Sequence, residues 1–142
     1  MHQPVTQEHG YGCGVACVAY ALRQSYGSAL RRFAHPQRAW QGGYFCKDLV
    51  AVLNAAGRRY RHCYVRPRHR SLLHQYGTIV YVQRSRRYPA GHYLIRTERG
   101  WMNPWTNFPC IHPVESGFQK RLPGRALYAI YESEDGRAWA GY

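Results

Sequence analysis

The sequence predicts an α+β domain of two layers, in which N-terminal helices are followed by an antiparallel sheet. Apolar residues recur at helical spacing only in the first part of the chain, before residue 57. Short segments rich in β-branched or alternating apolar residues follow, and turn residues separate them. A chain of 142 residues has the length of one domain, and no linker or repeat divides it. We therefore treat residues 1–142 as a single domain.

Three helices are expected in the N-terminal part. The first begins at Cys13, where apolar residues start to recur three and four positions apart, and ends at Tyr26-Gly27. Ser28 is the predicted N-cap of a short second helix over residues 29–33. The third covers residues 47–56, whose leucines and valines form one apolar face.

Strands dominate the remainder of the chain. The patterns predict strands at residues 60–65, 78–82, 92–96 and 101–102, a short helical turn at 71–74, and a closing strand at 126–131. The segment 103–123 contains four prolines and is expected to be loop. The acidic stretch 132–135 is expected to be exposed.

Cys13 is the residue whose surroundings point most clearly to chemistry. It stands between two glycines at the start of the first helix. A helix N-terminus favours the thiolate over the thiol, so this position predicts a depressed pKa and a nucleophile. The alternative is a small buried hydrophobic residue, which is the usual role of a free cysteine. Cys17, one helical turn later, is expected to pack in the core.

Gln7 lies six residues before Cys13. Its side-chain amide and the Cys13 backbone N–H would supply two donors for the oxyanion that forms during acyl transfer. A solvated surface glutamine is the alternative. Gly12 and Gly14 carry no side chain, so a substrate backbone could approach the thiol closely. Gly91 and Trp105 are two further candidates, so the predicted substrate-binding residues are Gly12, Gly14, Gly91 and Trp105.

His92 is the candidate general base, and Asn103 the residue that orients its ring. His92 opens a predicted strand, and Asn103 follows the next strand in an Asn-Pro turn. The rival histidines are His9, close to Cys13 in sequence, and His112, in a proline-containing loop. The tryptophans on either side of Asn103, at 101 and 105, either shield its hydrogen bond from water or fill the core.

The order Gln7, Cys13, His92, Asn103 resembles that of papain-like cysteine proteases, and more narrowly that of the C39 and C39-like peptidases. The shared features are a glutamine followed by Cys-Gly-x-x-Cys, a histidine that opens a late strand, and a polar residue before proline. Two positions differ, because Gly12 stands where that family often has aspartate, and Asn103 replaces its usual aspartate. The resemblance implies a papain-like fold and a catalytic set of Cys13, His92, Asn103 and Gln7.

A structural zinc site is an alternative use of the cysteines at 13, 17, 46, 63 and 110. No Cys-x-x-Cys pair is present and no second tightly spaced pair accompanies Cys13 and Cys17. We therefore expect neither a metal nor a cofactor. The odd number of cysteines and their spacing suit a reducing compartment.

The charge is strongly positive, with 20 basic and 7 acidic residues and a formal net charge of +13. Arginines cluster between residues 58 and 70 and between 84 and 87. Such a surface attracts acidic partners at long range. Nucleic acid is an open alternative that we do not favour, because no recognised nucleic-acid-binding module is visible. No segment reaches the length of about 20 apolar residues that spans a membrane, and no secretory signal is present, so we expect a cytoplasmic protein.

The leading hypothesis is a cysteine peptidase or related thiol acyl-transfer enzyme that acts on a peptide or protein substrate. An acidic substrate would suit the positive charge of the protein. The alternative is a catalytically silent, basic C39-like module that docks nucleic acid or an acidic protein.

Overall fold

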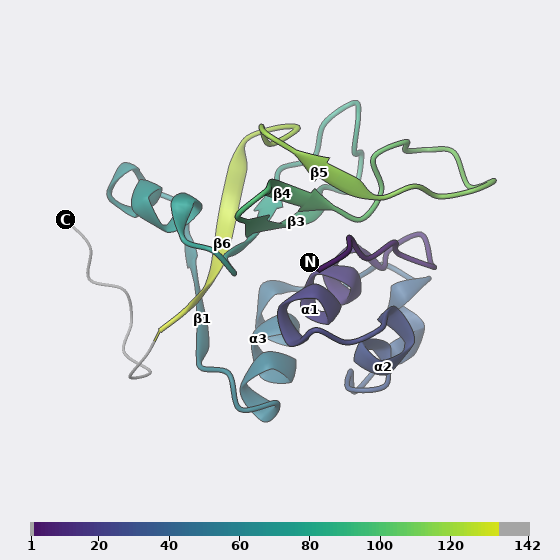
Figure 1. The fold of residues 1–142 in the computed structure, drawn as a ribbon, viewed down its shortest axis with the longest axis horizontal. Helices are drawn as coiled ribbons and strands as arrows, with labels where there is room; N and C mark the ends of the chain where they lie inside the picture. The colour runs from purple at the N-terminus through teal and green to yellow at the C-terminus, as the bar shows by residue number, and fades with distance from the viewer. Residues whose placement is uncertain (1, 134–142) are drawn as a thin grey trace.

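The computed structural model describes residues 2–133 and has two layers, with the three α-helices gathered on one side of a sheet (Figure 1). The helices are α1 (Cys13–Leu22), α2 (Tyr26–Leu30) and α3 (Cys46–Ala55), and two short 3₁₀ helices, η1 (Pro36–Ala39) and η2 (Pro67–His74), lie in the connections. Helices precede the strands along the chain. The predicted α+β class and its order of layers are therefore confirmed.

The sheet has six strands in the order β1-β6-β2-β3-β4-β5, and every neighbouring pair is antiparallel. The strands are β1 (Tyr60–Tyr64), β2 (Ile79–Val82), β3 (His92–Thr97), β4 (Gly100–Asn103), β5 (Gly117–Gln119) and β6 (Ala126–Glu132). Because β3 and β4 form a hairpin, the first residue of β3 and the last residue of β4 both lie towards its open end. These residues are His92 and Asn103.

Helix α1 lies inside the protein, where it packs against the sheet and against the other helices. All of its residues from Gly14 to Ala19 are buried, which explains why its sequence is apolar on every side. They share one core with Leu49 of α3 and with Ile95 and Met102 of the sheet. On the opposite face of the sheet, η2 contributes to a second, smaller core. The packing of α1 across β3 fixes the start of the helix relative to the start of the strand.

The boundary between the first two helices differs from the prediction. Helix α1 ends at Leu22, because Arg23 adopts a left-handed conformation with φ of 56°. The residues Tyr26-Gly27, predicted to end the first helix, begin α2 instead. The N-cap of α2 is Ser25, whose hydroxyl accepts the backbone N–H of Ser28 at 3.1 Å. Ser28 is therefore inside the helix, and the predicted cap was three residues too late.

Two other predictions are wrong towards the C-terminus. The segment 103–123, expected to be loop, contains β5, which pairs with β4 and sets Gln119 opposite Trp101. Three residues are too few to show a strand pattern. The acidic stretch 132–135 is not wholly exposed, because Glu132 ends β6 and is ion-paired with Arg58. Residues 134 and 135 lie outside the described residues.

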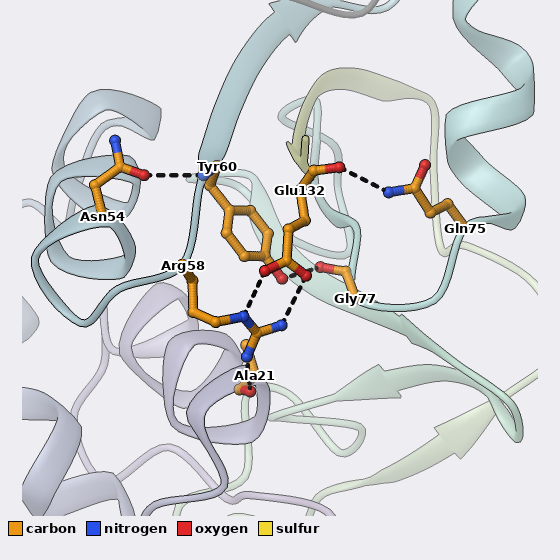
Figure 2. A network of polar contacts seen from close by, with 7 residues as sticks. All are labelled: Ala21, Asn54, Arg58, Tyr60, Gln75, Gly77 and Glu132. Carbon is orange, nitrogen blue, oxygen red and sulfur yellow. Dashed lines mark hydrogen bonds and ion pairs between the residues drawn. The ribbon is translucent and has the colours of Figure 1, made fainter. Parts of the chain in front are cut away.

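Arg58 connects the helical layer to one end of the sheet (Figure 2). Its guanidinium contacts Glu132 at two points, Nε to Oε2 at 2.5 Å and Nη2 to Oε1 at 2.8 Å. Its Nη1 donates to the carbonyl of Ala21, near the end of α1, at 3.0 Å. Beside this pair, the Asn54 side chain accepts the backbone N–H of Tyr60 at 2.9 Å. These bonds hold α1, α3, β1 and β6 together.

Candidate active site

His92 and Asn103 are joined by a hydrogen bond at the open end of the β3–β4 hairpin. The Nε2 atom of His92 lies 2.7 Å from Oδ1 of Asn103, and both residues are buried. An amide oxygen can only accept, so Nε2 carries the proton and the neutral ring has its lone pair on Nδ1. The sequence predicted these two residues as base and orienting residue, and the structure brings them together. Nδ1 is the nitrogen left to accept a proton from a nucleophile.

The Asn103 amide is fixed by bonds at both of its polar atoms. Its Oδ1 also accepts the backbone N–H of Trp105 at 2.9 Å. Its Nδ2 donates to the hydroxyl of Tyr88 at 3.1 Å and to Oε1 of Gln119 at 2.9 Å. A buried amide with this many partners loses hydrogen bonds if it rotates. Asn103 therefore holds the His92 ring in one orientation.

Tyr88 covers the ring of His92. The two rings are stacked, with centroids 4.0 Å apart and planes within 3° of parallel. Tyr88 is buried, and its hydroxyl donates to the carbonyl of Trp105 at 2.7 Å. Phe108 packs against both Tyr88 and Trp105. These aromatic rings keep water away from the bond between His92 and Asn103.

Sequence reasoning missed Tyr88 and Gln119. Tyr88 lies in the arginine-rich segment 84–91, which has the composition of a surface loop. Gln119 belongs to the short strand β5, inside a segment predicted as loop. Neither has a local signal, because each acquires its role from contacts with Asn103 across the fold. Only the aromatic character of Tyr88 among arginines distinguished it from its neighbours.

The environment of His92 keeps the ring neutral. Burial lowers the pKa of His92 to about 4, the hydrogen bond to Asn103 offsets part of this shift, and the charge of Arg87 adds to it. Burial dominates because the charged imidazolium loses its hydration. At neutral pH the ring is therefore unprotonated at Nδ1 and able to act as a base.

Cys13 begins α1 and lies against the start of β3. Its sulfur is within hydrogen-bonding reach of the backbone N–H of Tyr93, the residue after His92. Burial raises the pKa of the Cys13 thiol to about 11, although this N–H and those of Gly14 and Cys13 itself lower it. The depressed pKa predicted from the helix start is therefore wrong for this conformation. Desolvation outweighs the favourable effect of the helix N-terminus.

Gln7 belongs to the segment before Cys13 and is buried against the residues that follow β4. Its backbone N–H donates to the carbonyl of Pro104 at 3.3 Å. Its Nε2 donates to the carbonyl of His9 at 2.9 Å and makes a longer contact of 3.4 Å with that of Gly10. Within residues 2–133 its Oε1 has no hydrogen-bond partner. Gln7 thus adjoins both halves of the site, and its role at an oxyanion stays a prediction.

The glycines predicted to contact substrate are close to protein side chains. A Cβ at Gly12 would overlap the hydroxyl of Tyr26, and one at Gly91, where φ is 78°, would overlap that of Tyr81. A Cβ at Gly14 would approach the side chains of Leu49 and Tyr93, at 3.1 and 3.2 Å. Close packing, and at Gly91 the positive φ, therefore favour glycine at these positions whether or not a substrate binds there. Substrate contact at the three glycines stays a prediction.

The two tryptophans near Asn103 lie in different surroundings. Trp105 is 6% exposed, and its Nε1 donates to the carbonyl of Cys110 at 2.9 Å. It packs beside the His92–Asn103 pair, which leaves little of its ring for the predicted substrate contact. Trp101 belongs to the second core, on the far face of the sheet, where Arg96 lies over its ring. Trp105 contacts Asn103 through its backbone N–H, and Trp101, two residues before Asn103 in β4, points to the same face of the sheet as Asn103.

The rival histidines have other positions. His9 is held by the hydroxyl of Tyr26, 3.0 Å from its Nδ1, and its ring contacts Trp40. His112 is exposed in the loop after Cys110.

All five cysteines are free thiols, and Cys17 is buried in the core as predicted. Among residues 2–133 there is no group of three or more His, Cys, Asp or Glu side chains placed to hold a metal ion.

Most of the predicted basic clusters are exposed. Arg58 is the exception, since it is half-buried in its ion pair with Glu132. In the described part of the chain, the other ion pair joins Arg38 to Asp48 at 3.7 Å. The exposed members are Arg59, Arg61, Arg66, Arg68, Arg70, Arg84, Arg86 and Arg87.

The fold is similar to that of a solved structure, the crystal structure of the peptidase domain of Streptococcus ComA, a bi-functional ABC transporter involved in a quorum sensing pathway. The TM-score is 0.56 at 18% sequence identity, over 94% of this chain and 98% of that domain. At this identity the likeness concerns the fold alone. It confirms the predicted C39-like arrangement of N-terminal helices and antiparallel sheet.

The sequence itself matches no family model and no curated protein. Among the described residues, no helix is both long enough and apolar enough to span a membrane.

Proposed function

We propose that this protein is a cysteine peptidase, or a closely related thiol acyl-transfer enzyme, with Cys13 as nucleophile and His92 as general base. The observation that carries the proposal is the buried bond between His92 and Asn103, which uses Nε2 and leaves the lone pair of the ring on Nδ1. The sulfur of Cys13 is within hydrogen-bonding reach of the backbone N–H of Tyr93, the residue after His92. Among residues 2–133, no hydrogen bond joins this sulfur to the His92 ring itself. The likeness to a peptidase domain in fold supports the same function.

The reaction begins from a neutral pair. At pH 7 the Cys13 thiol is protonated, because its pKa is raised to about 11, and His92 is unprotonated, because its pKa is lowered to about 4. We expect the proton to move from Sγ to Nδ1 as the sulfur attacks the bound substrate. A bond forms between sulfur and the carbonyl carbon, and the π electrons of the carbonyl move onto its oxygen.

The oxyanion requires donors near Cys13. The backbone N–H of Cys13 is one, and Gln7 is the proposed second. The Nε2 atom of Gln7 lies 2.9 Å from the carbonyl of His9 and 3.4 Å from that of Gly10. To serve at the oxyanion, the amide exchanges the longer contact with Gly10 for the substrate oxygen.

The acyl-enzyme then forms and is resolved. Protonated His92 gives its Nδ1 proton to the leaving amine as the carbon–nitrogen bond breaks, which leaves a thioester on Cys13. Water, after losing a proton to Nδ1, attacks the thioester, and the thiol is released with that proton. If an amine replaces the water, the same steps give transpeptidation.

The test is a cleavage assay on a mixed peptide library, with products identified by mass spectrometry. Wild type is compared with Cys13→Ala and His92→Ala, and Cys110→Ala is the control because Cys110 is an exposed cysteine. Wild type and Cys110→Ala should cleave the same bonds. Cys13→Ala should be inactive, and His92→Ala should lose about 10²- to 10⁴-fold in rate. Unchanged cleavage by Cys13→Ala would overturn the proposal.

The cleavage assay tests one half of the alternative, a catalytically silent basic module, because that alternative requires a wild-type protein that cleaves nothing. The other half is a binding measurement with nucleic acid or an acidic protein, in which Cys13→Ala should bind as the wild type does.

A further inference from the structure

Strand β1 is an edge of the sheet, and it presents unused backbone groups. It is the outermost strand beside β6 (Figure 1). The backbone bond from Ser133 to the carbonyl of Arg59 shows which residues of β1 face β6. By the alternation of an antiparallel pair, Arg61 and Cys63 also face β6, so Tyr60, His62 and Tyr64 direct their backbone groups outward.

The side-chain contacts agree with this direction. Asn54 accepts the backbone N–H of Tyr60, and Figure 2 shows it reaching that nitrogen from the side opposite Glu132. The carbonyl of Tyr64 is within bonding reach of the His69 ring. Within residues 2–133, the backbone N–H and C=O of His62 have no partner, and neither does the N–H of Tyr64. One more extended segment could pair with these groups.

A basic groove adjoins this edge. It has a volume of about 690 Å³ and runs between α3 and β1, with Val50 and Asn54 on the helix side and Arg59, Arg61 and His62 on the strand side. Arg59 and Arg61 are exposed, and within residues 2–133 neither forms an ion pair. The groove therefore offers positive charge beside open backbone donors and acceptors.

We propose that the β1 edge binds an extended acidic segment of a partner protein, which adds to the sheet as a seventh strand. Backbone pairing at His62 would give the register, and carboxylates of the partner would pair with Arg59 and Arg61. The site is separate from the residues proposed for catalysis and does not rest on them.

The charges on the edge decide between occupants. A second copy of this chain would bring its own Arg59 and Arg61 against those of the first, and like charges resist edge-to-edge pairing. Nucleic acid would satisfy the arginines, but it has no alternating amide and carbonyl groups to pair with His62. An acidic peptide meets both requirements.

The experiment measures binding of a fluorescent peptide of alternating valine and glutamate to the full chain by anisotropy. A valine–lysine peptide of the same length tests charge. A valine–glutamate peptide N-methylated at alternate residues tests strand pairing, because it keeps the charges but loses the donors on one edge. The measurements are made on wild type and on Cys13→Ala, which should bind equally because catalysis is not involved.

The protein variants separate pairing from charge. His62→Pro removes the outward N–H, and proline is tolerated on an edge strand. It should weaken binding by about tenfold, which corresponds to the loss of about one hydrogen bond. Arg59→Glu with Arg61→Glu should abolish binding. Arg84→Glu with Arg86→Glu makes the same change in net charge at other exposed arginines and should leave binding unchanged.

Several outcomes would overturn the inference. Equal binding of the methylated and unmethylated peptides would show that no strand is added, even if His62→Pro failed to fold. An equal loss with the Arg84 and Arg86 pair would show general charge attraction. A single-stranded DNA oligonucleotide that binds more tightly than the acidic peptide, and is insensitive to His62→Pro, would identify a nucleic-acid surface instead.

Discussion

The side-chain oxygen of Asn103 lies 2.7 Å from Nε2 of His92, and the same oxygen accepts the backbone N–H of Trp105. The ring is thus oriented by a residue that is itself held by the backbone of the following turn. Because this bond uses Nε2, Nδ1 is the ring nitrogen to which the proposed mechanism transfers the proton. An uncharged amide in this place also leaves burial as the dominant influence on the ring, which keeps its pKa low.

Replacing Asn103 by aspartate should move the pH dependence of the reaction. The carboxylate keeps an acceptor for Nε2 but adds a negative charge beside the ring, which favours the imidazolium. The pKa of His92 should therefore rise, and the acid limb of kcat/KM should move from near pH 4 to higher pH. Asn103→Ser, which adds no charge, is the control and should lower the rate without this displacement. An unmoved acid limb in Asn103→Asp would contradict the assignment of His92 as the base.

The buried neutral His92 should make the fold sensitive to acid. Its pKa is lowered from 6.5 to about 4, so the unfolded chain binds the proton more readily than the folded protein. The free energy of unfolding is therefore unaffected by this group above pH 6.5. It decreases as the pH falls from 6.5 towards 4, by about 3 kcal/mol in total. His69, whose pKa is also lowered by burial, acts in the same direction.

Urea unfolding between pH 4 and 7.5 measures this effect. His92→Gln should flatten the dependence of the unfolding free energy on pH, whereas His62→Gln, at an exposed histidine, should not. If wild type and His92→Gln lose stability in parallel, the acid sensitivity arises elsewhere.

The Cys13 thiol should react slowly with small, non-directed reagents. With a raised pKa of about 11 it is almost wholly protonated at pH 7, and only the thiolate reacts. Iodoacetamide should therefore modify the exposed Cys110 before Cys13. A peptidyl electrophile that occupies the site should reverse this order, because it reacts in the geometry that transfers the proton to His92. Mass spectrometry of digested protein gives both rates, and faster iodoacetamide labelling at Cys13 would show that the thiolate exists before substrate binds.

Cys13 was identified from the sequence by its flanking glycines at a helix start, which is a local signal. His92 and Asn103 were identified by their combination with Cys13, in an order along the chain that resembles that of papain-like peptidases. The long helices and strands also have local signals, since their apolar spacing is visible within a few residues. The predicted start of the second helix was wrong because serine is a favoured N-cap residue at both Ser25 and Ser28, and the structure uses Ser25.

The remainder of the site depends on contacts between distant segments. Gln119 reaches Asn103 only because β5 pairs with β4, and β5 has too few residues to be recognised. The direction of the Cys13 pKa could not be inferred either. The helix start is a local feature, but the burial that outweighs it results from the packing of α1 against the sheet.

Tyr88 should contribute to both stability and rate through its hydroxyl. Tyr88→Phe leaves the carbonyl of Trp105 and one N–H of Asn103 without partners in a buried place, which costs about 1–3 kcal/mol. The rate should fall as well, because the Asn103 amide is less firmly oriented. Tyr76→Phe, at a side chain that is 63% exposed, is the matched control and should change neither. Urea unfolding and kcat give the two values, and a normal unfolding free energy in Tyr88→Phe would contradict the hydrogen bonds described here.

Arg58 should act mainly as a structural residue, although it begins the basic cluster between residues 58 and 70. A double-mutant cycle of Arg58→Met and Glu132→Gln should give a coupling free energy of about 1 kcal/mol. The ion pair is bidentate, but both side chains are only half-buried. High salt should reduce this coupling. Arg58→Met should lose further stability through the bond to the Ala21 carbonyl, whereas Arg59→Met, at an exposed arginine with no ion pair among residues 2–133, should be neutral. A coupling near zero would mean that solvent competes fully for Glu132, and Arg58 would then be available to partners like its exposed neighbours.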